Sequence, residues 1–466
     1  MMPVSKRTFA IFIIFISICQ YYSMFNPQSQ IYRQKPLFSG IILGMKIKRT
    51  KLGNGLRVIT IPMKDNPTVT VLVLVETGSK YENKANNGLS HFLEHMCFKG
   101  TERRPSARAI SHELDALGSQ YNAFTSQEYT GYYAKADSKH FKQVFDVVSD
   151  IYLNSTFPEG EMEKEKGVIV EEINMYEDMP QRHVQDLFME LLYGDQPAGW
   201  CIAGTRENVR AMKRKDFVNY KKAHYVPSAT TVVIAGSVTE SEMLSEAKKV
   251  FAKLKNTKKS TKKKVIERQS APKILLKYKA TDQTHLVLGV RTENAYSKNN
   301  ASLAVLATIL GGGMSSRLFI KLREEMGVTY YVKSDNDAYT DHGYFEIRAG
   351  VTNARVEEVV REILKECIDL KENLVSDDEL NKVKEYIVGT MKLELESTDA
   401  YAMFFGGQEV MRKKLEELES MERKIRKVSK EDVRNMAKKI FIDKHLNLAL
   451  IGPFKDSKFL EKGLHF

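Results

Sequence analysis

Apolar and polar positions alternate along this chain with two different periods, which predict a mixture of strands and helices. Residues 56–75 alternate and are rich in Val, Ile and Thr, which predicts two strands around a turn at 64–67. Residues 122–134 and 230–234 predict one further strand each. Apolar residues three or four positions apart, the spacing of amphipathic helices, occur in four segments, 89–98, 106–117, 140–153 and 161–176.

The order of predicted elements recurs in the second half of the chain. Strands are expected at 285–290, 345–349 and 447–451, and helices at 303–309, 317–325 and 356–370. A short sequence also recurs roughly half a chain length later, because Leu117-Gly118-Ser119-Gln120-Tyr121 corresponds to Met326-Gly327-Val328-Thr329-Tyr330. A repeat this long predicts two homologous α+β domains rather than a solenoid of short repeats.

Composition agrees with a folded protein of two domains. The chain has 466 residues, of which 42% are hydrophobic and 28% charged, values that exclude a disordered chain, a collagen-like fibre and a polytopic membrane protein. Its four cysteines, Cys19, Cys97, Cys201 and Cys367, lie far apart and form no CxxC pair. We therefore expect reduced thiols and neither a disulfide framework nor a thiolate zinc finger.

Most of the net charge of +12 lies in one stretch, residues 253–273, where lysines are interrupted by Ser and Thr. No aromatic residue interleaves with these lysines, as it would in a single-stranded nucleic-acid site. The stretch is typical of a solvated linker between a first domain at 45–252 and a second at 274–466. We expect no nucleic-acid partner.

The first 44 residues form an extension that allows two interpretations. Lys6-Arg7 precede an apolar run at 9–19, which is too short for a bilayer span of ~20 residues but fits the core of a signal peptide. No small-residue cleavage site follows it. If translation instead starts at Met45, the protein is cytoplasmic; otherwise the segment from Phe9 to Cys19 exports or anchors it. The sequence leaves both open.

The most informative stretch is His91-Phe92-Leu93-Glu94-His95. Residues three and four apart share a helix face, so both imidazoles could bind one zinc ion and Glu94 could take a proton from a water that zinc activates. This H-x-x-E-H order is the inverzincin motif. The alternative to a metal site is that both histidines lie on the surface beside a solvated glutamate.

Catalytic zinc also needs a third protein ligand and an open position. The candidates are carboxylates of the predicted helix at 161–176, and spacing alone does not choose among Glu161, Glu163, Glu165, Glu171 and Glu172.

With its flanking residues, from Leu89 to Met96 and then Phe98-Lys99-Gly100-Thr101, the motif resembles that of the pitrilysin- or insulinase-type zinc peptidases. The most similar branch is the one like mitochondrial processing peptidase and its bacterial relatives. The resemblance implies that Glu172, in Val168-Ile169-Val170-Glu171-Glu172, is the third ligand. It also implies that Glu165 supports the ligands, while Glu171 faces solvent.

The resemblance extends to the substrate site. Asn122, Ala123, Phe124 and Thr125 resemble the edge strand onto which that family adds its substrate as a further strand. In the second half, which has no H-x-x-E-H of its own, Arg323 and Tyr330 match an Arg-x6-Tyr pair. In that family the pair reaches across the cavity to the substrate and the developing oxyanion.

These observations predict a zinc metalloendopeptidase with one zinc ion per chain. Its two homologous domains, each a mostly antiparallel sheet with helices packed on it, would enclose a cavity. His91, His95 and Glu172 would bind zinc, and Glu94 would be the general base. The resemblance implies unfolded or presequence-like peptides as substrates and a homodimer or a heterodimer with a related subunit. The alternatives are a partner-dependent processing subunit and a non-catalytic scaffold of the same fold.

Overall fold

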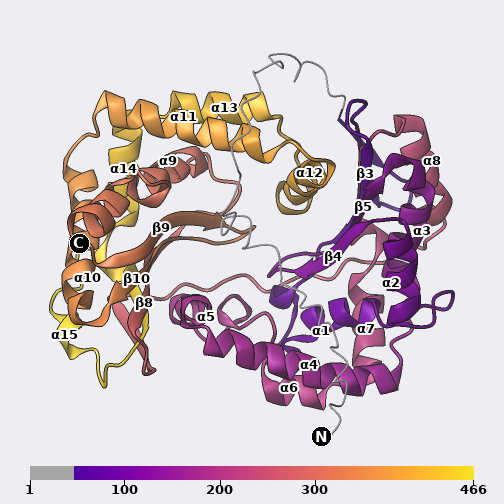
Figure 1. Ribbon diagram of the computed structural model, residues 1–466, viewed down its shortest axis with the longest axis horizontal. Helices are drawn as coiled ribbons and strands as arrows, with labels where there is room; N and C mark the ends of the chain where they lie inside the picture. Colours follow the sequence, from indigo (N-terminus) through magenta and orange to yellow (C-terminus); the bar gives the residue numbers. More distant parts are fainter. Residues whose placement is uncertain (1–46) are drawn as a thin grey trace, which may run out of the picture.

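The computed structural model describes residues 47–466, so the apolar segment at 9–19 and Met45 lie outside the described residues. Two sheets dominate the fold (Figure 1). The first has the order β1-β2-β6-β3-β5-β4. Its strands are β1 (Lys48–Lys51), β2 (Arg57–Pro62), β3 (Thr68–Val75), β4 (Gln120–Thr125), β5 (Thr130–Asp137) and β6 (Thr230–Gly236). The second has the order β7-β11-β8-β10-β9, with β7 (Lys273–Tyr278), β8 (Gln283–Thr292), β9 (Thr329–Ala338), β10 (Gly343–Thr352) and β11 (Asn447–Gly452).

Apart from β1, which pairs with β2 and has no counterpart in the second sheet, the two sheets have the same topology. In each, one parallel pair, β2 with β6 and β7 with β11, is followed by antiparallel neighbours that end in a hairpin at the edge, β5–β4 and β10–β9. The repeated sequence occupies the same place in both halves, because Gly118 and Gly327 each have a φ of +62° and lie two residues before the start of the edge strand. Glycine adopts this left-handed conformation without strain. The predicted fold class, α+β in two homologous domains, is confirmed.

Helices connect and cover the strands. In the first half they are α1 (Leu89–Cys97), α2 (Ala107–Ala116), α3 (Phe141–Leu153), α4 (Glu159–Asp178), α5 (Pro180–Tyr193), α6 (Arg206–Ala211), α7 (Arg214–His224) and α8 (Glu240–Phe251). In the second half they are α9 (Asn300–Gly311), α10 (Val356–Glu372), α11 (Asp377–Glu394), α12 (Thr398–Arg412), α13 (Leu418–Lys427), α14 (Lys430–Ile440) and α15 (Lys458–Glu461). Phe319–Glu325, predicted within an ordinary helix, forms a π-helical segment.

One predicted strand was wrong. Residues 122–134 form a hairpin rather than a single strand, with a turn at 126–129 between β4 and β5. The Ser126 hydroxyl accepts hydrogen bonds from the backbone N–H groups of Glu128 and Tyr129, at 3.2 and 3.1 Å. A serine side chain thus closes a turn that contains no glycine or proline, the residues by which turns are usually recognised in a sequence.

The central strands are buried on both faces, and the two faces of each sheet belong to different clusters. Val232 and Ile234 of β6 face the helices of the first half, whereas Val233 and Ala235 lie in a cluster with α12. In β11, Leu448 and Leu450 pack with helices of the second half and Ala449 with α5. Each sheet therefore needs helices packed on its inner face as well as on its outer face.

The helices on the inner faces are exchanged between the halves. Helix α12, from the second half, packs on β3 and β6 of the first sheet, and α5, from the first half, packs on β8 and β11 of the second (Figure 1). Glycines permit both close approaches: a Cβ on Gly406 of α12 would lie 2.6 Å from Leu74, and one on Gly289 of β8 would lie 2.7 Å from Phe188 of α5. The two halves thus share their cores.

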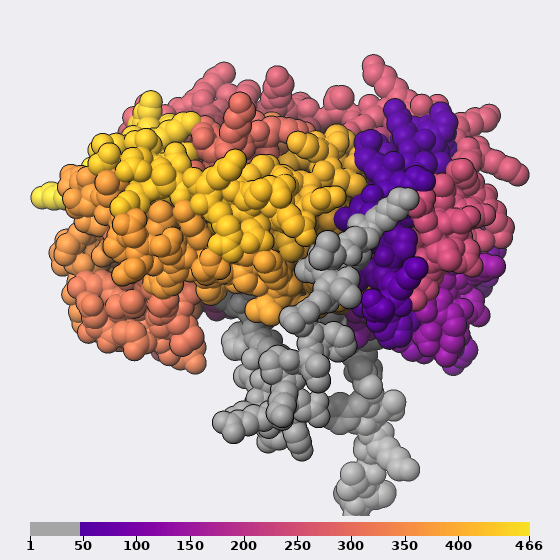
Figure 2. Space-filling model, turned by 90° about the horizontal axis from the view of Figure 1, so that it is seen from above, coloured from indigo at the N-terminus to yellow at the C-terminus, as the bar shows by residue number. Residues whose placement is uncertain are grey.

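The halves also meet at the surface. Seen from above, the yellow surface of the C-terminal half abuts the indigo surface of the first strands (Figure 2). Arg49 of β1 also pairs with the buried carboxylate of Glu409 on α12, with Nε to Oε2 at 2.7 Å. Within the described residues no helix is long and apolar enough to cross a membrane. Cys97, Cys201 and Cys367 are free thiols.

The basic segment at 253–273 does join the halves, but the prediction that it is solvated was wrong for part of it. Lys259 pairs with the buried Glu76, and Lys262 pairs with Glu128 and Asp341. These carboxylates lie far from the segment in sequence, so the charge pattern alone could not show that they face it.

Candidate active site

Helix α1 carries the predicted metal-binding motif and is anchored by its buried face and at its N-terminus. Phe92, Leu93 and Met96 are fully buried, as expected for core residues beside the motif. At the N-terminus, Gly88 has a φ of +99° and provides no side-chain cap. The carboxylate of Glu82 takes that place by accepting from the backbone N–H groups of Gly88 and Ser90, at 2.8 and 2.6 Å. This fixes the helix end from which His91 projects.

Helix α4 brings the carboxylate of Glu172 to the two imidazoles of α1. Glu172 Oε2 lies 3.7 Å from His91 Nε2 and 3.6 Å from His95 Nε2. The rings of His91 and His95 lie 4.6 Å apart, and one ligand atom from each of the three residues falls within a 4.8 Å cluster. Glu171, the neighbouring carboxylate, is exposed.

Glu165 orients one of the imidazoles. His95 Nδ1 donates to Glu165 Oε1 at 2.9 Å, which leaves His95 Nε2 facing Glu172. Lys99 pairs with the other oxygen of Glu165 at 2.6 Å. Burial opposes the carboxylate, but His95 and Lys99 outweigh it and lower the pKa of Glu165. Burial likewise opposes the imidazolium, but the hydrogen bond that His95 donates to Glu165, together with nearby carboxylates, raises the pKa of His95.

This donor set fits zinc. Tetrahedral coordination with Zn–N and Zn–O bonds of about 2.1 Å places ligand atoms about 3.4 Å apart, close to the two observed distances. The carboxylate behind His95 is the usual partner of a zinc-binding histidine. Burial lowers the pKa of His91 to about 4, which favours the neutral form of the ring, the form that binds metal.

Glu94 lies beside these residues and is held by the edge strand. Thr125, the last residue of β4, donates its hydroxyl hydrogen to Glu94 Oε2 at 2.5 Å. Burial raises the pKa of Glu94 to about 7, although His95 and the Thr125 hydroxyl favour the carboxylate. A carboxylate with such a pKa exchanges protons readily near neutral pH.

Strand β4, which contains all four predicted substrate-binding residues, is the edge strand of the first sheet. Within the described residues it pairs only with β5, so its other side offers backbone N–H and C=O groups for pairing. Ala123 and Phe124 are buried, and Asn122 is half-buried. A cavity of about 290 Å³ begins at Thr125 and is lined from the opposite side by residues of the second half, including Tyr339 and Tyr344. The halves therefore enclose space beside Thr125, the residue that donates to Glu94, although none of His91, Glu94, His95 and Glu172 lines this cavity.

Arg323 and Tyr330 contact each other, but they make no hydrogen bond or ion pair with the His91, His95 and Glu172 cluster within the described residues. Arg323 donates to the backbone carbonyl of Tyr330 and lies 5.1 Å from the centre of its ring. Tyr330, on the edge strand β9, is 72% exposed.

The sequence interpretation missed three contributions to this site. Glu82 as the anchor of α1, Lys99 as the partner of Glu165, and Thr125 as the donor to Glu94 became visible only in the structure. Glu82 precedes the motif by more than two helical turns in an irregular loop, where no periodicity marks it. Thr125 was chosen as part of the substrate strand and not as a partner of the base.

A largely buried His-His-Glu cluster beside a buried glutamate, on two helices of a duplicated α+β fold, is a donor set that zinc peptidases use. The comparisons identify the family. Residues 57–206 match the family described as Insulinase (Peptidase family M16), and residues 211–387 match the domain described as Peptidase M16 inactive domain. The chain belongs to the insulinase family, peptidase family M16.

Relatives span almost the whole chain. An uncharacterized zinc protease of Bacillus subtilis, YmxG, is 36% identical over 410 residues, which cover 87% of this chain and 98% of the relative. One of Streptomyces coelicolor is 33% identical over 418 residues, 88% of this chain and 91% of the relative. A protease from Helicobacter pylori has the same fold, with a TM-score of 0.83 at 23% identity over 88% of this chain and all of that one.

Proposed function

We propose that this chain is a zinc-dependent endopeptidase that binds one zinc ion and cleaves extended, unfolded or presequence-like peptides. The observation that supports this most is the convergence of His91, His95 and Glu172 next to Glu94, at the end of an edge strand. The names of the relatives, zinc proteases, agree with the metal.

Zinc in this site would polarise the scissile carbonyl and lower the pKa of a water molecule. Glu94 accepts the proton of that water and delivers it to the leaving amine, while the Thr125 hydroxyl keeps the carboxylate oriented. Glu165 holds His95 in the tautomer that presents Nε2. The free edge of β4 pairs with the peptide backbone, which selects extended segments of many sequences.

The test compares wild type with Glu94→Gln by metal analysis and digestion of a peptide library. Wild type should contain zinc and cleave peptides. Glu94→Gln should retain zinc but lose hydrolysis, because the amide cannot accept the proton. Activity within tenfold of wild type in this variant would contradict the assigned base.

We also propose that the active enzyme is a dimer, with a second copy or a related subunit. Tyr330 is exposed and carries a hydroxyl suited to an oxyanion, yet among the described residues no hydrogen bond or ion pair joins it to His91, His95 or Glu172 of its own chain. Its exposed position instead allows it to serve the cluster of a partner.

Complementation tests the dimer. Glu94→Gln and Tyr330→Phe should each be inactive or nearly so, and mixing them should restore activity if one chain supplies Tyr330 to the other's Glu94. A mixture no more active than the two variants measured separately would contradict the shared site. The scaffold alternative predicts no hydrolysis in any sample, and nothing in a scaffold requires the convergent ligands seen here.

A further inference from the structure

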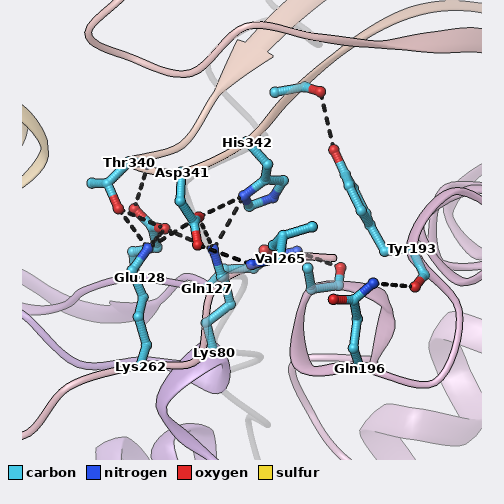
Figure 3. Close-up of polar contacts among 12 residues, drawn as sticks. Lys80, Gln127, Glu128, Tyr193, Gln196, Lys262, Val265, Thr340, Asp341 and His342 are labelled. Carbon is cyan, nitrogen blue, oxygen red and sulfur yellow. Dashed lines mark hydrogen bonds and ion pairs between the residues drawn. The ribbon is translucent and has the colours of Figure 1, made fainter. Parts of the chain in front are cut away.

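Five charged or titratable residues from three distant parts of the chain meet between the two halves (Figure 3). We name them the polar latch. They are Lys80 and Glu128 of the first half, Lys262 of the basic segment, and Asp341 and His342 of the turn between β9 and β10.

Every oxygen of the two latch carboxylates has a partner. Glu128 Oε1 accepts from Lys80 at 3.0 Å and also pairs with Lys262, while its Oε2 accepts from the backbone N–H of Thr340 at 2.9 Å. Asp341 Oδ1 accepts from both lysines, and its Oδ2 accepts from the backbone N–H of Val265 at 3.2 Å. The basic segment is therefore held by its backbone as well as by a side chain.

The latch is buried and its charges balance. The side chains of Lys80 and Glu128 are 1% and 3% exposed, and those of Lys262 and Asp341 are 16% and 19% exposed. Two ammonium groups neutralise two carboxylates. Although the acidic groups and His342 lie close enough together to suggest a metal site, both ammonium groups occupy the space between them. Removing one charge would leave a buried countercharge unpaired, which is costly.

The latch also touches the segment that orients the general base. Glu128 lies in the β4–β5 turn, which begins directly after Thr125. Lys80 clamps the same turn through its backbone, because its N–H donates to the carbonyl of Gln127 at 2.9 Å. Thr125, at the other end of this short connection, holds Glu94.

We infer that the polar latch is a positioning device: by clamping the β4–β5 turn between the halves, Lys262 and Asp341 set the orientation of Glu94 through Thr125. The inference rests on the proposed function for its catalytic consequence. The basic segment then links the packing of the two halves to the orientation of Glu94. Lys262 is a positioning residue and touches no reacting atom.

The test is Lys262→Met, which keeps an unbranched apolar stem and removes the charge. Lys263→Met is the matched control, because Lys263 is exposed and makes none of the latch contacts. At full zinc occupancy, Lys262→Met should lower kcat about tenfold with KM within threefold of wild type, since small displacements of a reacting group are costly while β4 stays paired with β5. Lys263→Met should stay within twofold in both, and Lys262→Arg should recover most of kcat.

Amide hydrogen exchange provides a readout independent of hydrolysis. In Lys262→Met, exchange at residues 120–130 should become at least tenfold faster, and exchange in the remote strand β11 should not change. Equal kcat and exchange in Lys262→Met and Lys263→Met would overturn the inference. Faster exchange throughout both sheets would overturn it too, because it would indicate general destabilisation. If wild type cleaves no peptide, the proposed function fails while the exchange experiment still decides whether the latch holds the turn.

Discussion

At the scale of single residues, the site depends on which way each carboxylate of α4 points. Glu171 and Glu172 are adjacent in sequence and therefore differ by about 100° in direction around the helix. One is exposed, and the other lies within 3.7 Å of both imidazoles. The same chemical group can thus act as a ligand or as a solvated surface charge, depending on a single position.

This difference makes a direct prediction. Glu172→Gln should lose most of its bound zinc, because a neutral amide is a poor zinc ligand, whereas Glu171→Gln should bind zinc as wild type does. Metal content after dialysis against a weak chelator measures both. Equal losses in the two variants would mean that the ligand is assigned to the wrong residue.

Thr125 permits a second prediction at this scale. Its hydroxyl bonds to the charged form of Glu94 and so lowers the pKa of that carboxyl. Thr125→Val removes this bond and should raise the pKa, so the acidic limb of the kcat/KM profile should move to higher pH. Thr125→Ser retains the hydroxyl and should leave the limb in place. A limb that does not move in Thr125→Val would show that the hydroxyl does not tune the base.

At the scale of elements, two helices connect the halves because each packs on the sheet of the other half. The inner face of each sheet is covered by a helix that belongs in sequence to the other half, α12 on the first and α5 on the second. Gly406 lets α12 approach β3 closely, and its neighbour Gly407 has no atom within 4 Å of the position a Cβ would take.

Two alanine substitutions separate packing from helix propensity. Both Gly406→Ala and Gly407→Ala gain the same intrinsic propensity, up to about 1 kcal/mol. Only Gly406→Ala forces a methyl group against Leu74, which typically costs about 1–3 kcal/mol. Gly406→Ala should therefore melt at a lower temperature than Gly407→Ala in parallel thermal scans. The reverse order would mean that α12 is not tightly packed on the sheet.

At the scale of the whole molecule, the two halves form one folded unit around a shared interior. Each half supplies an apolar helix that packs on the sheet of the other half. Lysines of the connecting segment neutralise the buried carboxylates of Glu76 and Glu128. Cavities beside β4 are lined by residues of both halves, one of them with a volume of about 420 Å³ between Phe124 and α12.

Cutting the connection should therefore not separate the halves. A protease site introduced at 255–258, where the side chains are exposed, should be cleaved efficiently. The nicked protein should still elute as one particle and retain zinc, because α5 and α12 remain packed on the opposite sheets. Uncleaved protein is the control. Elution of two separate halves would show that the packing of α5 and α12 on the opposite sheets does not hold the halves together.

The sequence alone predicted many of the elements in their correct order, because apolar periodicity is a local property and each half repeats it. It did not predict strands β1 and β7 or helices α5 and α12. The sequence also predicted the candidate metal-binding face of α1, since His91, Glu94 and His95 lie three and four residues apart on one helix. The third ligand was different: spacing left five glutamates open, and only the family resemblance singled out Glu172. That residue lies on another helix, whose rotation is set by packing.

Only the tertiary structure decided which distant groups meet. The donation from Thr125 to Glu94 depends on a hairpin that contains no conventional turn residue, and the latch depends on Lys262 finding carboxylates in both halves. The packing of α5 and α12 on the opposite sheets likewise cannot be recognised in the local sequence, because an apolar helix face has the same sequence pattern whichever sheet it covers. These contacts arise from the burial of complementary surfaces separated by long stretches of chain, which no local pattern encodes.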